Sequence, residues 1–100
     1  LYGGYARGRR RRNDPREAEE ADLQERAILF GWGRENPAFR QIFTSQFIPD
    51  ATREQMDDWD AMQRVSTSAE HAAAILRTTS ELDVTALLPR VRVPTLVVHS

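Results

Sequence analysis

Residues 91–98 have the sequence Val-Arg-Val-Pro-Thr-Leu-Val-Val. Its last three residues are apolar and contiguous, as in a strand of a parallel sheet that is covered on both faces. We therefore predict a strand over 94–99, with Pro94 near its start, where a missing ladder donor is tolerated. A buried strand needs paired neighbours, and the sequence offers no second complete strand. We expect a fragment of a larger fold, since the chain starts at Leu1 and stops at Ser100, directly after the apolar run.

Four helix-start signals precede this strand. Each combines a capping side chain with a proline at the first helical position or with a glutamate or glutamine three residues later. The signals are Asp14-Pro15-Arg16-Glu17, Asn36-Pro37, Thr52-Arg53-Glu54-Gln55 and Thr67-Ser68-Ala69-Glu70. They predict helices near 15–30, 37–47, 53–65 and 68–78. A short turn from Asp83 to Leu88, stopped by Pro89, follows. By itself the chain is therefore expected to be mainly α, with about four helices plus strand stubs.

Apolar residues recur at helical spacing within these predicted helices. In the first, Leu23, Ala27 and Phe30 fall at positions i, i+4 and i+7 and define the expected buried face. The second carries Phe39, Ile42, Phe43 and Phe47, and the third carries Met56, Trp59 and Met62. We interpret the aromatic set first as core, with the lining of an apolar substrate cleft as a second use of the same side chains.

The composition is that of an ordinary water-exposed surface. The formal net charge is −1, 29% of residues are charged, and all 14 basic residues are arginine. This balance gives no overall bias toward nucleic acid or a membrane. The absence of cysteine excludes disulfides and thiolate metal sites, and no run approaches the roughly 18 apolar residues of a spanning helix. We expect a cytoplasmic protein with no membrane partner.

Glycines and arginines near the start of the chain match phosphate-binding patterns only in part. Gly3 and Gly8 have the spacing of a phosphate-binding loop, but Arg9 and Arg10 stand where that loop needs lysine and a hydroxyl. The arginine run 9–12 is favoured as a solvated loop over a nucleic-acid contact, because no groove-reading helix follows it. Nucleic acid is therefore an unlikely partner.

Acidic, histidine and serine residues give no catalytic or metal signature. Asp57, Asp58 and Asp60 lack the pattern of a calcium loop, and we expect a solvated helix face on which Asp60 pairs with Arg64. His71 and His99 have no zinc-ligand spacing around them. The serines, at positions 45, 66, 68, 80 and 100, all lie outside a Gly-x-Ser-x-Gly elbow. We expect no catalytic residue, no metal and no cofactor in this chain.

Several short stretches resemble the α/β-hydrolase family. Residues 83–100, from Asp83 to Ser100, resemble the approach to a late sheet strand, and Leu1-Tyr2-Gly3-Gly4 resembles the end of the preceding one. Between them, the matching stretches are Asn36-Pro37-Ala38-Phe39, Phe43-Thr44-Ser45-Gln46-Phe47-Ile48-Pro49 and Gln63-Arg64-Val65-Ser66-Thr67-Ser68. These resemble the cap of a bacterial subgroup in which the hydrolase is often joined to a nucleotide cyclase or a helix-turn-helix regulator.

The resemblance implies a division of the chain and a role for it. The implied segments are 1–4 as the end of a core strand, 5–14 as an arginine-rich loop, 15–89 as a helical cap and 90–100 as the lead-in and next core strand. The catalytic serine, acid and histidine would all lie outside the chain. The segment would roof the active site of a serine-type hydrolase of esters or amides, with the rest of the core and a small-molecule substrate as its partners.

Two other functions remain open at this stage. One is a hydrolase-like sensor domain that has lost catalysis and signals to a cyclase or DNA-binding partner. The other is a small independent helical interaction module that uses its arginine loop. Within the hydrolase hypothesis, Trp32 is the candidate substrate-binding residue, because Gly31 and Gly33 flank it at a helix end and it lies outside any apolar stripe.

Overall fold

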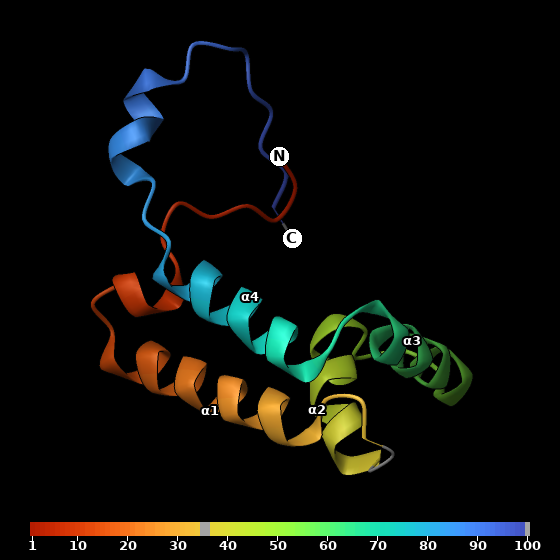
Figure 1. Ribbon diagram of the computed structural model, residues 1–100. Coiled ribbons are helices and arrows are strands. Elements are labelled where there is room, and N and C mark those ends of the chain that lie inside the picture. The colour runs from red at the N-terminus through yellow and green to blue at the C-terminus, as the bar shows by residue number, and fades with distance from the viewer. Residues whose placement is uncertain (35–36, 100) are drawn as a thin grey trace.

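The computed structural model describes residues 1–34 and 37–99. The chain is mainly helical, as the capping signals predicted. Within the described residues its elements are η1 (Arg9–Arg11), α1 (Pro15–Gly31), α2 (Pro37–Phe47), α3 (Arg53–Ser66), α4 (Ala69–Glu81) and η2 (Thr85–Arg90), where η marks a short 3-10 helix. Helices α1 and α4 lie side by side and run in opposite directions, with α2 and α3 at one end of the pair (Figure 1). Both chain ends join η2 in a second lobe.

Side-chain caps start three of the helices. The Asp14 carboxylate accepts from the Arg16 amide at 2.9 Å, and Thr52 and Gln55 form the predicted reciprocal capping box. Helix α4 corrects the prediction by one residue, because Ser68, not Thr67, accepts from the His71 amide at 3.2 Å. The predicted cap at Asn36 lies outside the described residues.

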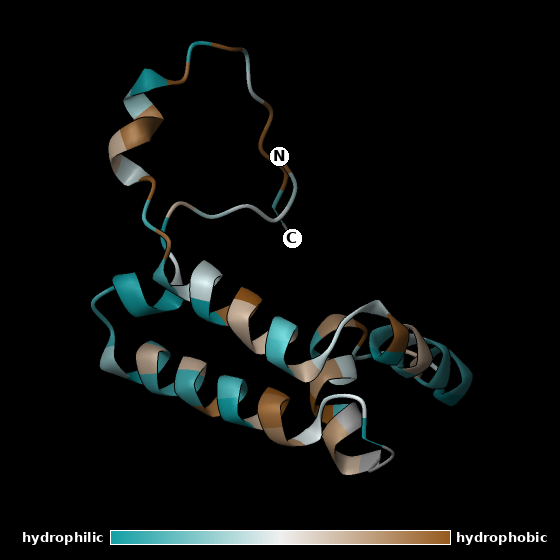
Figure 2. Ribbon diagram, viewed as in Figure 1, coloured by the Kyte–Doolittle hydropathy of each residue, from teal (hydrophilic) through white to brown (hydrophobic). Residues whose placement is uncertain are grey.

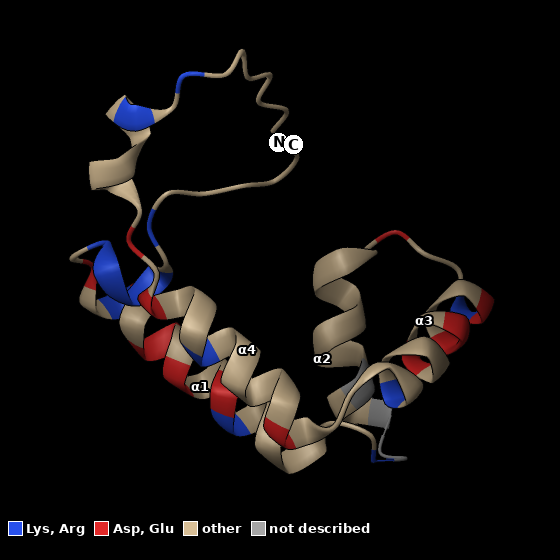
Figure 3. Cartoon of the chain, turned by 45° about the horizontal axis from the view of Figure 1, so that its top comes forward, with Lys and Arg blue, Asp and Glu red and all other residues tan. Residues whose placement is uncertain are grey.

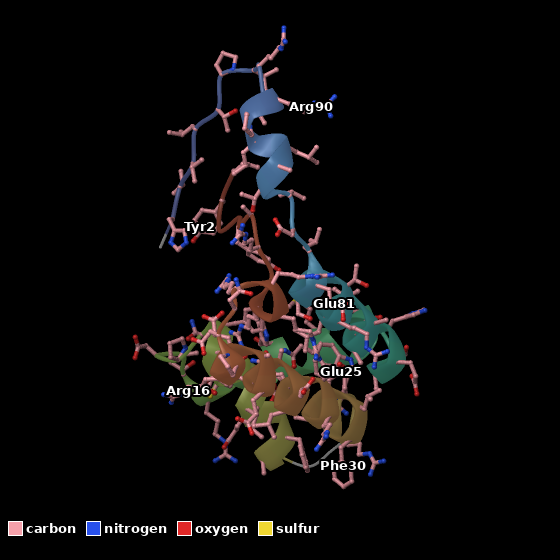
Figure 4. The ribbon with its side chains drawn as sticks, turned by 90° about the vertical axis from the view of Figure 1, so that its left-hand side faces the viewer. Tyr2, Arg16, Glu25, Phe30, Glu81 and Arg90 are labelled. Carbon is pink, nitrogen blue, oxygen red and sulfur yellow. The ribbon has the colours of Figure 1, made fainter. Side chains whose placement is uncertain are left out.

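The buried face of α1 differs from the predicted one. Leu23 and Phe30 are 60% and 59% exposed, and Figure 4 shows Phe30 at the far end of the helix, where its ring centroid lies 5.2 Å from that of Phe39. The buried residues are instead Ala21, Glu25, Ile28 and Gly31. Small side chains let α4 approach closely, and α4 presents its own small residues, Ala72 and Ala73, to this face. Of the large apolar side chains of α1, Ile28 is therefore on the buried face, whereas Leu23 and Phe30 are not.

The apolar core lies where α1, α2 and α4 meet. Ile28, Phe43, Ala72 and Ala73 form it, with Ala27, Trp32 and Leu76 packed around it. The aromatic residues predicted as core are divided between burial and surface. Phe43 is 6% exposed, whereas Phe47 is 64% exposed and stacks on the half-buried Trp59 at 5.6 Å between ring centroids.

A buried polar pair joins α2 to α3. Thr44 is completely buried, and its hydroxyl donates to the carboxylate of Asp60, which is only 4% exposed. The expectation that Asp60 belongs to a solvated face is therefore wrong. The prediction holds for Asp57 and Asp58, which precede Asp60 on the same helix and are exposed. A hydrogen bond satisfies one oxygen of this carboxylate inside the protein.

The second lobe contains the two chain ends. Tyr2 and Val98 form a parallel bridge, with hydrogen bonds from Gly3 N to Val98 O at 3.1 Å and from Val98 N to Leu1 O at 2.8 Å. Within the described residues, the predicted strand over 94–99 is a single bridge at Val98. Figure 2 shows hydrophobic residues along this lobe and on η2, where Leu87 and Leu88 are each 52% exposed.

No helix in the described ranges has both the length and the apolar character that crossing a bilayer requires. The mean hydropathy of the chain is −0.59.

The backbone of Gly8 approaches the end of α4, and this contact gives a stability prediction. A Cβ added at Gly8 would overlap the carbonyl oxygens of Thr79 and Ser80, which belong to rigid backbone. We expect Gly8→Ala to lower the free energy of unfolding by about 3 kcal/mol. Urea denaturation followed by circular dichroism measures this. Gly4→Ala is the matched control, because its nearest neighbour would be the Leu1 Cβ at 4.0 Å. Equal stability of the two variants would contradict the assignment.

Candidate functional site

The polypeptide enters and leaves the helical body through two adjacent segments, residues 6–8 and 82–85, which we call the neck. Gly8 N donates to Leu82 O at 2.8 Å, and Val84 N donates to Ala6 O at 2.9 Å. Residues at positions 7 and 83 form an antiparallel bridge between these bonds. The neck therefore clamps the start of η1 against the end of α4.

Side chains reinforce the neck around Asp83. Its carboxylate accepts from the Thr85 amide at 3.0 Å and from the Thr85 hydroxyl at 2.6 Å, and it lies 3.4 Å from the Arg7 guanidinium. The hydrogen bonds from Thr85, with the charges of Arg7 and Arg11, hold the pKa of the Asp83 carboxyl below its ordinary value.

The two paired chain ends have a direction relative to the helical body. Both Leu1–Gly4 and residues 95–98 run toward the helices, so their carboxyl ends lie at the edge of the pair that faces the body (Figure 1). In open α/β sheets, ligands bind in the crevice outside the carboxyl ends of the strands. Tyr5 follows directly after one of these ends, and its side chain lines a large cleft.

This cleft lies between η1, α1, the end of α2 and α4, and its volume is about 940 Å³. Leu23, Phe47 and Leu76 supply apolar surface from three different helices. Leu23 and Phe47 are exposed and do not belong to the core, and both line this cleft. Such a combination of apolar walls with a few polar groups is typical of small-molecule sites.

A chain of polar contacts crosses the cleft. The guanidinium of Arg9 donates to Gln24 Oε1 at 3.2 Å, and Gln24 Nε2 donates to Gln46 Oε1 at 3.1 Å. These bonds join η1, α1 and α2 and fix the orientation of the Gln24 amide. Arg12 also lines the cleft, with its guanidinium 5.7 Å from the centre of the Tyr5 ring. No motif in the sequence marks either glutamine, so neither was predicted as a site residue.

The arginine run is not the solvated loop that we expected at Arg10. Its side chain donates to Glu25 at 3.1 Å and to Ser80 at 3.2 Å, and it forms an ion pair with Asp22 at 2.5 Å. Glu25, whose side chain is 11% exposed, also accepts from Arg77 of α4. Figure 4 shows Glu25 inside the helical body, and Figure 3 shows the basic turn η1 beside acidic residues of α1.

The network forms around the buried negative charge of Glu25, to which Arg10 and Arg77 donate. The hydrogen bond and the charge of Glu25 raise the pKa of the Arg77 guanidinium above its ordinary value. Glu25 lies on the small-residue face of α1 between Ala21 and Ile28. That helical spacing is the sequence signal that could have identified Glu25 as a buried acid. The network is structural, because protein groups already engage its charges.

Trp32, the candidate substrate residue, lies at the junction of three helices. Its indole donates to the carbonyl of Thr67 at 3.0 Å, and its ring centroid is 5.8 Å from that of Phe43. The indole therefore ties the end of α1 to the α3–α4 turn, and it does not line the 940 Å³ cleft. Its contact with a substrate stays a prediction.

A second cavity of about 610 Å³ lies where α2 turns into α3. Ile48, Trp59 and Met62 give it apolar walls. The indole nitrogen of Trp59 is buried and has no hydrogen-bond partner in the part of the chain that the structure describes. Because this nitrogen does not reach the surface, it cannot contact a molecule in the cavity without a rearrangement.

Serine and histidine side chains do not assemble into a catalytic site within residues 1–34 and 37–99. Ser45 and Ser66 donate to helix carbonyls, and Ser80 donates to the carbonyl of Arg77. His71 borders a small threonine-lined cavity of about 380 Å³. No group of three metal-ligating side chains occurs in this described part. Comparison of the chain with models of protein families, with curated proteins and with solved structures finds no match.

The buried ion-pair network gives the second stability prediction. Glu25→Gln removes the negative charge that Arg10 and Arg77 share, and we expect the free energy of unfolding to fall by about 2–3 kcal/mol. Glu20→Gln is the control on the same helix, because its half-exposed carboxylate only meets the exposed Arg16 at 3.5 Å. We expect its effect to stay below about 0.5 kcal/mol. Chemical denaturation of both variants measures the difference, and equal losses would refute the network.

The neck gives a pH prediction. The pKa of Asp83 is lower in the folded chain than its ordinary value of 3.8, so the ionised carboxylate stabilises the fold above that pH. The stabilisation is lost as the pH falls through the folded-state pKa. Asp83→Asn removes the charge, and we expect wild type to be more stable than this variant at neutral pH. The difference should shrink in acid, as measured by denaturation across pH. A difference that is constant with pH would contradict the assignment.

Proposed function

We propose that this chain is the cap segment of a serine-type α/β-hydrolase. Residues 15–89 form the cap, 1–4 and 90–100 belong to two strands of the core sheet, and the catalytic triad lies outside the chain. The observation that carries the proposal is the parallel pairing of Tyr2 with Val98, with the whole helical body inserted between them. Parallel neighbours need a long crossover, and here that crossover is a helical layer.

The exposed apolar surface of the paired ends supports this proposal. Tyr2, Leu96 and Val97 are 79%, 77% and 60% exposed. Parallel sheets are buried on both faces, so a two-stranded parallel pair is a poor structure in water. Further strands beside this pair, and helices on its faces, would cover these side chains. The rest of a hydrolase core supplies both.

The position of the 940 Å³ cleft supports a role in binding the substrate. The carboxyl ends of the two paired segments face the helical body, and Tyr5 leads from one of them into the cleft. A cap in this position covers the crevice in which the family places its active site. By analogy, the reaction is hydrolysis of an ester or amide through an acyl-enzyme intermediate. The segment then shapes specificity through Leu23 and Phe47.

The arginine run gives little support to an independent interaction module. Arg7, Arg10 and Arg12 already form ion pairs within the chain, with Asp83, Glu25 and Glu17. A module that bound a polyanion would need these charges to be available.

The test uses the full gene product that carries this chain. We expect a fluorophosphonate probe to label one serine outside residues 1–100, and p-nitrophenyl esters to be hydrolysed. Leu23→Ala should change the ratio of kcat/KM between long and short acyl esters by about threefold to tenfold, because one apolar wall of the cleft is lost. Leu29→Ala is the matched control, since Leu29 lies on the same helix, is 49% exposed and does not line the cleft.

Three results would overturn the proposal. Labelling of a serine within residues 1–100 would place the nucleophile inside the chain. Absence of both labelling and hydrolysis in the folded protein would favour the non-catalytic sensor. Identical acyl-chain profiles for Leu23→Ala and Leu29→Ala would show that this cleft does not contact the substrate.

A further inference from the structure

We propose that the cleft between η1, α1, α2 and α4 binds an amphipathic carboxylate, with Arg9 at the carboxylate and Leu23, Phe47 and Leu76 along the apolar chain. The identification of this molecule with the substrate or product of the cap rests on the proposed function. Binding itself is a property of the cleft and can be measured without catalysis.

Arg9 is the charged group that carries the inference. It is partly buried at the cleft, and among the described residues no carboxylate pairs with it. Its observed contact is with the neutral amide of Gln24. A partly desolvated guanidinium without a counter-charge is costly, and an incoming anion would remove that cost. The planar guanidinium also matches a carboxylate in geometry.

Its neighbours in the turn are already paired. Arg10 is held by Asp22 and Glu25, and Arg12 lies 3.4 Å from Glu17. Arg11 is exposed, donates to the Glu81 carbonyl and acts on the Asp83 carboxylate through its charge, and it does not line the cleft. Arg9 is therefore the arginine of the turn that combines a free positive charge with a position in the cleft.

The other charge at the cleft is compatible with one anion. Glu20 contributes a carboxylate to the rim, and Arg16 lies 3.5 Å from it on the same helix. The ion pairs of Glu20 and of Arg12 leave Arg9 as the unbalanced charge. One excess positive charge fits a singly charged carboxylate better than a doubly charged phosphate monoester.

The remaining cleft surface fits the apolar part of such a molecule. Leu23 and Phe47 expose 60% and 64% of their surface, and both line the cleft with Leu76. These side chains come from α1, α2 and α4, so an apolar chain would contact three helices at once. Gln24 and Gln46 also line the cleft, and their hydrogen bonds hold the Arg9 side chain in place.

The experiment is titration of the full gene product that carries this chain with decanoate, followed by calorimetry. We expect saturable binding that Arg9→Gln weakens about tenfold or more, because a charged hydrogen bond is lost. Arg11→Gln changes an arginine of the same short helix that does not line the cleft, so this variant should bind decanoate with the affinity of wild type. Decyltrimethylammonium and acetate should not bind measurably, since one has the wrong charge and the other has no apolar chain.

A second readout places the ligand. In NMR spectra we expect decanoate to shift the side-chain amide resonances of Gln24 and Gln46, and these shifts should be reduced in Arg9→Gln. Far-UV circular dichroism confirms that each variant is folded. Equal affinity of Arg9→Gln and wild type, equal binding of the cationic probe, or absence of binding to the helical chain would each overturn the inference.

The outcomes also separate this inference from the proposed function. Decanoate binding without esterase activity in the full gene product would refute the hydrolase proposal and support the carboxylate site. Esterase activity with no Arg9-dependent decanoate binding would refute the carboxylate site and support the hydrolase proposal.

Discussion

The buried carboxylate of Glu25 is the constraint on which the arrangement of the helical body depends. It accepts hydrogen bonds from Arg10 in the turn before α1 and from Arg77 in α4, so one side chain connects three elements. The close approach of α1 and α4 through alanines makes this geometry possible, because larger neighbours would hold the helices apart. The same approach buries the acid, so its charge requires both arginines.

The fixed position of η1 has an effect on the surface beside it. Because Arg10 points inward to Glu25, the adjacent side chains of the short helix point elsewhere, and Arg9 reaches the cleft. The hydrogen bonds of Gln24 then link this arginine to α2. An arginine-rich segment that looks uniform in sequence thus has different roles at successive residues. Arg10 holds the helical body together, and Arg9 lines the cleft.

Sequence reasoning identified the elements better than their faces. The local chemistry of Asp14, Thr52 and Ser68 fixes where helices begin, and such caps depend on only a few neighbouring residues. The buried face of α1 depends on what packs against it, and small residues were preferred over Leu23 and Phe30 for that reason. The polar pair of Thr44 with Asp60, and the chain through Gln24, join residues from different helices, and no local pattern in the sequence indicates such contacts.

The neck brings the segment that enters the helical body next to the segment that leaves it. Its incoming and outgoing segments are hydrogen-bonded neighbours, with Gly8 N only 2.8 Å from Leu82 O. An insertion whose two ends meet in this way occupies no more of a host sheet than a short turn would occupy. The helices can then lengthen, shorten or be exchanged for another body while the register of the flanking strands stays the same. Under the proposed cap function, the neck is a junction at which one scaffold can acquire different lids, and the small size of Gly8 keeps that junction narrow.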